Sequence, residues 1–223
     1  MINPAPALAF DAVGLGPLWP SSRPLSLTLA QGEWALWVEP DPLLSQAFLS
    51  LALGQAAPSW GEIRWFGALR PGPTELWENC AFSRRLGYVP KNGRLFSGRS
   101  LLENLGLYFE YALGHDRETA RNESRLWLEK LGLANQAETL GEKMPEDKLP
   151  LALFALNVAK KPDLFILDRP RRRFERDFPV VWSSLLEQKA ARNLAVLIFE
   201  PSQGTWRPEV EAKTLTLWSP SAS

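Results

Sequence analysis

The side chains with the clearest chemical potential surround one apolar run that ends in a carboxylate. The sequence Asp163-Leu-Phe-Ile-Leu-Asp168 predicts a buried strand, and the basic run Arg169-Pro-Arg-Arg-Arg173 follows it directly. A carboxylate at a strand end could ligate a magnesium ion. Because arginines adjoin it, we interpret Asp168 as a cap or an ion-pair partner. The arginine run is typical of a solvated face, and its alternatives are contacts with anionic lipid, nucleic acid or an acidic partner loop.

Other reactive side chains are scarce. Cys80 is the single cysteine and His115 the single histidine among 223 residues. These numbers exclude a disulfide framework and a zinc site built from cysteine and histidine. We interpret both residues as structural or incidental, since neither has a second group to complete a site.

The overall composition narrows the class of protein. Twenty-five basic and 25 acidic residues give zero net charge and a pI of about 6.6, which argues against a dedicated nucleic-acid binder. Hydrophobic residues make up 45% of the chain, no apolar run is long enough to span a membrane, and no signal peptide is evident. We therefore expect a cytoplasmic protein, with most of its ten tryptophans in the core.

Hydrophobic patterns predict strands that alternate with helices. Strands are expected near 25–29, 34–38, 60–66, 85–89, 163–168, 194–199 and 214–218. Helices are expected near 43–53, 100–113, 117–131, 147–159 and 177–191. In the third helix, Leu126, Trp127, Leu128 and Leu131 should form a broad apolar face. This alternation predicts an α/β fold with a largely parallel, covered sheet.

Several short segments lie in the order and spacing of one known family. They are Leu25–Glu33, Gly61–Gly67, Leu86–Pro90 followed by Leu95-Phe96 and Glu103-Asn104, Leu128–Leu133, and Pro162–Pro170. Together they resemble the nucleotide-binding domain of ABC transporters over nearly the whole chain. The resemblance implies a mostly parallel core sheet with helices, an N-terminal antiparallel β part and an inserted helical subdomain. It divides the chain into 1–90 (β part and core), 91–160 (helical subdomain) and 161–223 (rest of the core).

The family's phosphate loop is replaced by different residues. That loop needs G-x-x-x-x-G-K-[ST], because its glycines let backbone N–H groups close on the phosphates and its lysine adds charge. The resemblance aligns it without a gap to Glu39-Pro-Asp-Pro-Leu-Leu-Ser-Gln-Ala47. Both glycines are gone, two prolines remove backbone donors, and Ser45, Gln46 and Ala47 replace the lysine and hydroxyl residues. The acidic side chains would also repel a polyphosphate.

The family's other functional motifs change in the same direction. The signature loop L-S-G-G-Q aligns with Met144-Pro-Glu-Asp-Lys148, and the Q-loop glutamine becomes Lys91. Arg169 replaces the catalytic glutamate, and a cation cannot act as a general base. Phe199-Glu-Pro201 lacks the switch histidine, and the D-loop region is Arg171–Phe174. We therefore expect a catalytically inactive domain with no cofactor.

The resemblance also implies partners for this pseudo-ATPase. Such domains bind the coupling helices of a membrane permease near the Q-loop, here through Tyr88, Pro90, Lys91, Leu95, Phe96 and Asn104. We expect a structural or regulatory subunit on the inner face of the cytoplasmic membrane. It should form a homodimer or a heterodimer, with another ABC ATPase subunit as a further candidate partner. No nucleic-acid partner is expected.

Two alternatives remain open from the sequence. In an unconventional ATPase, Lys91 or Arg64 would replace the loop lysine and Asp168 would hold magnesium, so that ATP and magnesium would be cofactors. In a soluble adaptor, the face 169–173 would bind the partner. The family-equivalent nucleotide positions are Trp19, Ser45, Gln46, Lys91 and Asp168, and Trp19 is interpreted as packing rather than as an adenine contact.

Overall fold

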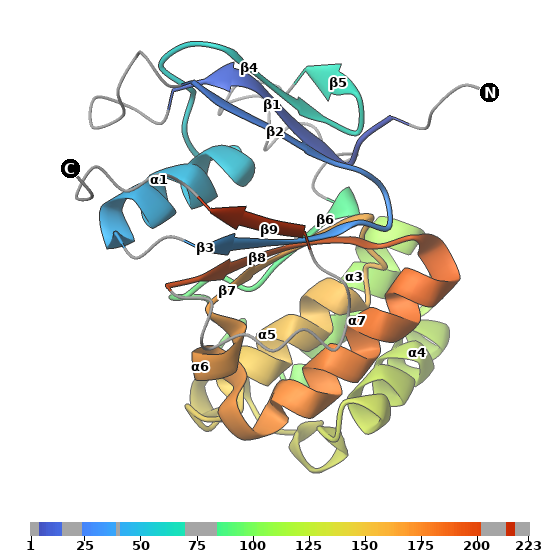
Figure 1. Ribbon diagram of the computed structural model, residues 1–223. Helices are drawn as coiled ribbons and strands as arrows, with labels where there is room; N and C mark the ends of the chain where they lie inside the picture. Colours follow the sequence, from blue (N-terminus) through green and yellow to red (C-terminus); the bar gives the residue numbers. More distant parts are fainter. Residues whose placement is uncertain (1–4, 15–23, 39–40, 70–83, 202–212, 217–223) are drawn as a thin grey trace. The chain divides into compact units, whose positions relative to one another are not determined.

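The computed structural model describes residues 5–14, 24–38, 41–69, 84–201 and 213–216 (Figure 1). The chain divides into two compact units. The first combines Met1–Leu86, Asp163–Pro170 and Lys189–Ser223, and the second combines Gly87–Pro162 and Arg171–Gln188. The helical subdomain expected at 91–160 thus lies within the second unit, which also takes in 171–188.

The first unit contains an antiparallel sheet of four strands. These are β1 (Leu8–Val13), β2 (Leu25–Leu29), β4 (Glu62–Trp65) and β5 (Ala68–Leu69), in the order β2-β1-β4-β5. Strand β2 alternates buried and exposed residues along its length, as its sequence predicts. Gly61 enters β4 with a φ of 80°, and a Cβ atom there would lie 2.3 Å from the carbonyl oxygen of Ala12. The close approach of these two segments therefore requires glycine.

A second sheet has five strands in the order β6-β7-β8-β3-β9 (Figure 1). They are β6 (Leu86–Tyr88), β7 (Leu164–Asp168), β8 (Ala195–Glu200), β3 (Trp34–Val38) and β9 (Lys213–Thr216). Strand β3 pairs in parallel with β8 and β9, and β7 pairs in parallel with β8. All residues of β3 and β8 are buried, as in parallel sheets covered on both faces. The predicted parallel sheet is confirmed.

Tryptophans fill much of the core, as expected. Five of those in the described part of the chain are buried: Trp34, Trp37, Trp65, Trp127 and Trp182. The ring of Trp37 lies 3.7 Å, centroid to centroid, from Phe48 of helix α1 (Pro42–Ala52). The indole N–H of Trp34 donates to the carbonyl oxygen of Leu194 at 3.1 Å. A hydrogen bond of this kind offsets the cost of burying the indole.

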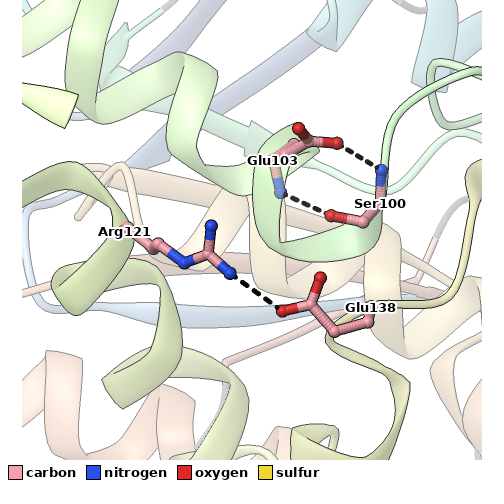
Figure 2. A network of polar contacts seen from close by, with 4 residues as sticks. All are labelled: Ser100, Glu103, Arg121 and Glu138. Atoms are coloured by element: carbon pink, nitrogen blue, oxygen red, sulfur yellow. Dashed lines mark hydrogen bonds and ion pairs between the residues drawn. The ribbon is translucent and has the colours of Figure 1, made fainter. Parts of the chain in front are cut away.

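The helices of the described chain beyond α1 correspond to the predicted ones, except for the short helix α6, which was not predicted. They are α3 (Leu101–Leu113), α4 (Arg117–Lys130), α5 (Leu149–Val158), α6 (Pro170–Phe174) and α7 (Phe178–Arg192), with 3₁₀ turns at Ala134–Gln136, Gly141–Lys143 and Glu175–Asp177. Ser100 caps α3 by accepting from the Glu103 N–H, and the Glu103 carboxylate accepts from the Ser100 N–H (Figure 2). Arg121 of α4 pairs with Glu138 at 3.1 Å, and Figure 2 shows this pair beside the cap.

The apolar face predicted for α4 needs one correction. Trp127, Leu128 and Leu131 are buried, but the side chain of Leu126 is 60% exposed. Residues 120, 124, 127, 128 and 131 share one face of a 3.6-residue helix, whereas position 126 lies outside this stripe. The inclusion of Leu126 in the face was therefore wrong.

Candidate functional site

The carboxyl end of the parallel sheet carries Asp168 and Glu200. Asp168 ends β7 in register with Phe199 of β8, and Glu200 ends β8 in register with Val38 of β3. Ligands of open α/β sheets bind at this edge. Glu200 is only 5% exposed, and it stands in the segment where the family's switch histidine falls. The sequence predicts that the histidine is missing there, but it gives no sign that the carboxylate is buried.

Asp168 has a cationic neighbour. The Nε atom of Arg169 lies 3.7 Å from its Oδ1 atom, so the ion pair expected from the sequence is present. The backbone N–H of Arg169 donates to the carbonyl oxygen of Phe199 at 2.9 Å, and its φ of 48° lies in the left-handed region. Within the described part of the chain, no three His, Cys, Asp or Glu side chains form a group that could hold a metal ion.

Helix α1 begins where the resemblance places the phosphate loop. The Asp41 carboxylate caps this helix by accepting from the Leu43 N–H at 2.8 Å, and the Asp41 carbonyl accepts from the Ser45 N–H at 3.0 Å. Pro42, at the first helical position, has no N–H to offer. A helix N-terminus binds phosphate through its free N–H groups and its dipole. Here a carboxylate of the chain already occupies that position.

The remaining family-equivalent positions of α1 also lack the chemistry of a phosphate site. The side chain of Ser45 is buried, with 8% of its surface exposed. Gln46 donates from Nε2 to the hydroxyl of Ser50 at 3.2 Å. Neither residue supplies the positive charge that a triphosphate needs. The described residues of this segment therefore do not fit the phosphates of magnesium ATP.

The segment aligned with the signature loop leads into helix α5. The carbonyl oxygen of Pro145 accepts from the N–H groups of Lys148 and Leu149 at 3.0 and 2.9 Å, and Pro150 has no N–H. Glu146 and Asp147 are exposed. These first N–H groups of α5 are bonded internally or absent, and the exposed charges beside them are negative.

Beside this segment lies an open cavity of about 550 Å³. Its walls come from 146–150 and 173–177 and carry both signs of charge. Two of the charges neutralise each other, because Nζ of Lys148 lies 2.9 Å from Oδ1 of Asp177. The cavity therefore has no net cationic surface of the kind a phosphate binds.

The residues expected to bind a permease fall into two groups. Lys91 and Phe96 are exposed, Phe96 by 66%, and Tyr88 and Pro90 are half-buried. Leu95 and Asn104 are buried, so their assignment as contact residues needs correction.

Asn104 instead holds the loop from inside the second unit. Its Oδ1 accepts from the Phe96 N–H at 2.8 Å. Its Nδ2 donates to the carbonyl oxygens of Phe96, Arg99 and Ser100 at 3.2, 3.2 and 2.9 Å. A buried amide whose oxygen and nitrogen are both bonded to backbone is a positioning group rather than a partner contact.

The arginine run is not a uniform solvated face, contrary to the expectation. Arg171 and Arg172 are exposed, but Arg173 is half-buried and donates from Nη1 and Nη2 to the carbonyl oxygens of Val89 and Pro90. No sequence signal distinguished Arg173 from its neighbours, since its acceptors lie more than 80 residues earlier in the chain.

Other residues singled out from the sequence lie apart from these sites. Trp19 and Cys80 fall outside the described residues. The ring of His115 stacks on Phe109 at 6.0 Å between centroids, in keeping with a structural role. Arg64 of β4 pairs with Glu62 at 2.6 Å.

The chain is similar in sequence to proteins that are named as ATP-binding proteins. The cell division ATP-binding protein FtsE of Haemophilus influenzae is 24% identical over 183 residues, which are 82% of this chain and 83% of FtsE. The octopine permease ATP-binding protein P of Rhizobium radiobacter is 22% identical over 126 residues, covering 56% of this chain and 48% of that protein. No protein-family model matches the chain.

Solved structures establish the fold. CbiO1 from Clostridium perfringens, part of the ABC transporter complex CbiONQ, superposes with a TM-score of 0.67 at 15% identity, covering 89% of this chain and 79% of CbiO1. The ATP-binding cassette MJ0796, as a dimer bound to ADP and Pi, gives a TM-score of 0.72 at 16% identity. The match covers 88% of this chain and 89% of the MJ0796 chain. In the described residues, no helix has the length and apolar character to cross a membrane. The chain thus has the fold of ABC-type ATP-binding domains and resembles such domains along most of its length.

Proposed function

We propose that this protein is a non-catalytic homologue of ABC ATP-binding domains and acts as a structural or regulatory subunit of a membrane transport complex. One observation carries the proposal: the Asp41 carboxylate caps helix α1 where a nucleotide phosphate would have to bind. A phosphate placed there would displace the cap and meet like charge. Both effects oppose binding.

The chemistry at the sheet edge supports the same conclusion. Hydrolysis of ATP needs a group that orients or deprotonates the attacking water and a cation that neutralises the leaving phosphate. The position of the general base carries Arg169, which pairs with Asp168. The aligned signature segment contributes the negative charges of Glu146 and Asp147. The residues aligned with the general base and with the signature loop therefore do not supply the family's groups at these positions.

The segment 88–99 is the surface that we propose for the permease. It presents the exposed ring of Phe96 together with three exposed cations, Lys91, Arg94 and Arg99. The segment contains no carboxylate, although the whole chain is neutral. An exposed aromatic ring surrounded by like charges fits a partner with an apolar pocket and acidic residues at its rim. We propose such a segment of a permease subunit, which would hold the protein at the inner face of the membrane.

A calorimetric titration of the purified chain with magnesium ATP tests the loss of nucleotide binding. We expect no heat of binding and no thermal shift up to millimolar nucleotide. A ligand at one hundred times its dissociation constant would stabilise the fold by about 2.7 kcal/mol, which a thermal scan detects. Micromolar affinity would refute the proposal. ATP turnover that disappears in Asp168→Asn would favour the unconventional ATPase instead.

Affinity capture from membranes solubilised from the source organism tests the partner. We expect a permease subunit, with or without an active ABC ATPase subunit, to be retained by the wild type in low salt. Phe96→Ala should reduce this retention at least tenfold, whereas the matched variant Leu126→Ala, at an exposed apolar position outside the segment, should not. Equal retention by Phe96→Ala would exclude this segment as the docking surface.

A further inference from the structure

The segment 88–99 is held at its start by an arginine from a distant part of the sequence. Arg173 of α6 donates from its two terminal nitrogens to the carbonyl oxygens of Val89 and Pro90. The next residue, Phe174, is buried and packs edge-on against Phe154 of α5 at 5.8 Å between centroids. Because this neighbouring ring is anchored in the core, the backbone that carries Arg173 is fixed.

The turn after Pro90 depends on the same acceptor. The carbonyl oxygen of Pro90 also accepts from the Gly93 N–H at 3.1 Å, which closes the turn 90–93. A Cβ atom at Gly93 would lie 2.7 Å from Cδ1 of Leu153 and 2.8 Å from Cγ of Pro90. The turn therefore lies directly against α5, and Arg173 and Gly93 share one carbonyl oxygen.

The end of the segment has separate anchors. Asn104 bonds both the N–H and the carbonyl oxygen of Phe96. A Cβ atom at Gly141 would lie 2.5 Å from that carbonyl oxygen, so the backbones of the two loops nearly touch. The ring of Phe96 is nevertheless exposed. An exposed aromatic side chain is thus presented by a backbone that is fixed on both sides.

We propose that Arg173 is a positioning residue that keeps the segment 88–99 in its docking conformation without any nucleotide. The inference rests on the proposed function. It adds that binding of the partner to the segment 88–99 does not depend on ATP. A guanidinium suits this role because its planar fork bonds two acceptors at once, which an ammonium does less well. Fixing a binding segment in advance removes part of the ordering cost of association.

Amide hydrogen exchange measured by NMR on the full chain tests the role of Arg173. In Arg173→Ala we expect the Gly93 amide to exchange roughly tenfold to a hundredfold faster, since a charge-assisted bond to its shared acceptor is lost. Arg173→Lys should restore part of the protection. Arg172→Ala, an exposed arginine of the same helix, should leave Gly93 unchanged. The amides of Phe96, held by Asn104, and of Ile198, in the core, should keep their wild-type rates in every variant.

Two results would overturn this role. One is wild-type exchange at Gly93 in both Arg173→Ala and Arg173→Lys. The other is equal acceleration in Arg172→Ala, which would mean that loss of positive charge alone loosens the turn. If Arg173→Ala does not fold, Arg173→Lys carries the comparison by itself.

A nucleotide titration separates this inference from the proposed function. With millimolar magnesium ATP, the Gly93 exchange rate of the wild type should stay constant. A changed rate would refute nucleotide independence. Binding of ATP with the Gly93 rate unchanged would refute the pseudo-ATPase proposal alone, and the comparison of the arginine variants would still decide the role of Arg173.

Discussion

Replacement of Asn104 by alanine gives the sharpest test of how the second unit holds its exposed loop. Asn104 is 3% exposed, and its amide makes four hydrogen bonds to the backbone of 96–100 at 2.8 to 3.2 Å. Alanine removes all four and leaves the Phe96 N–H without its acceptor. Three of the four bonds share the two hydrogens of Nδ2, so the set counts as about three net bonds. At about 0.5–1.5 kcal/mol for each net bond, the sum is roughly 2–4 kcal/mol.

Thermal and urea unfolding followed by circular dichroism would measure this loss. For a chain of this length, each 1 kcal/mol lowers the melting temperature by about 2–4 °C, so Asn104→Ala should melt roughly 5–15 °C below the wild type. The matched control is Asn157→Ala on α5. Asn157 donates to Leu153 in its own helix and accepts from Lys160, so its replacement should cost less than about 1 kcal/mol.

Two results would refute this reasoning about Asn104. A loss below about 1 kcal/mol in Asn104→Ala would mean that water replaces the amide without cost. An equal loss in Asn157→Ala would mean that any asparagine of these helices contributes as much, whatever its partners.

Three further predictions concern capping and charge. Asp41→Ala should lower the free energy of unfolding by about 1 kcal/mol in urea titrations, while Asp41→Asn, which can still cap α1, should stay near the wild type. The hydrogen bond from the Ser100 backbone lowers the pKa of Glu103 in the folded state. The Glu103 carboxylate therefore stabilises the fold fully above its unfolded pKa, and this stabilisation disappears as the pH falls through its folded pKa. Between about pH 5 and 3, the free energy of unfolding should therefore depend less on pH in Glu103→Gln than in the wild type. The exposed control Glu129→Gln should not show this reduced dependence. Burial lowers the pKa of Lys160, so the free energy of unfolding should rise with pH above that lowered value. Lys160→Met should stabilise the protein at neutral pH and should make the free energy of unfolding depend less on pH in this range. Lys161→Met should have neither effect.

Local patterns were enough to predict most of the elements. Alternation in 25–29 and the unbroken apolar runs at 34–38 and 164–167 correspond to β2, β3 and β7. The helix expected near 100–113 corresponds to α3, and the capping box of Ser100 and Glu103 at its start is a local interaction that the structure adds. Strand β1 and the short helix α6 were not assigned, since neither has a long enough pattern to stand out without its tertiary contacts.

The site was predictable only where its interactions are local. The pair of Asp168 and Arg169 could be expected because the two residues are adjacent. The sequence predicted the helix near 43–53 and a repulsive charge at Asp41, but it did not predict that the Asp41 carboxylate caps this helix. The roles of Asn104 and Arg173 depend on backbone carbonyl oxygens that only the folded chain brings within hydrogen-bonding distance. Every residue has such a carbonyl oxygen, so the sequence does not indicate which ones will act as acceptors.

The burial of Ser45 determines what would happen if a phosphate-loop lysine were grafted onto α1. A lysine placed at this position alone would carry its ammonium into the packed side of α1, where Phe48 and Leu49 are also buried. Burying an uncompensated charge costs several kcal/mol, a large part of the stability of a typical domain. A phosphate loop grafted at this position would therefore need its glycines, its lysine and a repacked helix together, because the lysine alone would give a less stable protein. The packing of α1 thus opposes a stepwise conversion of this segment into a phosphate loop.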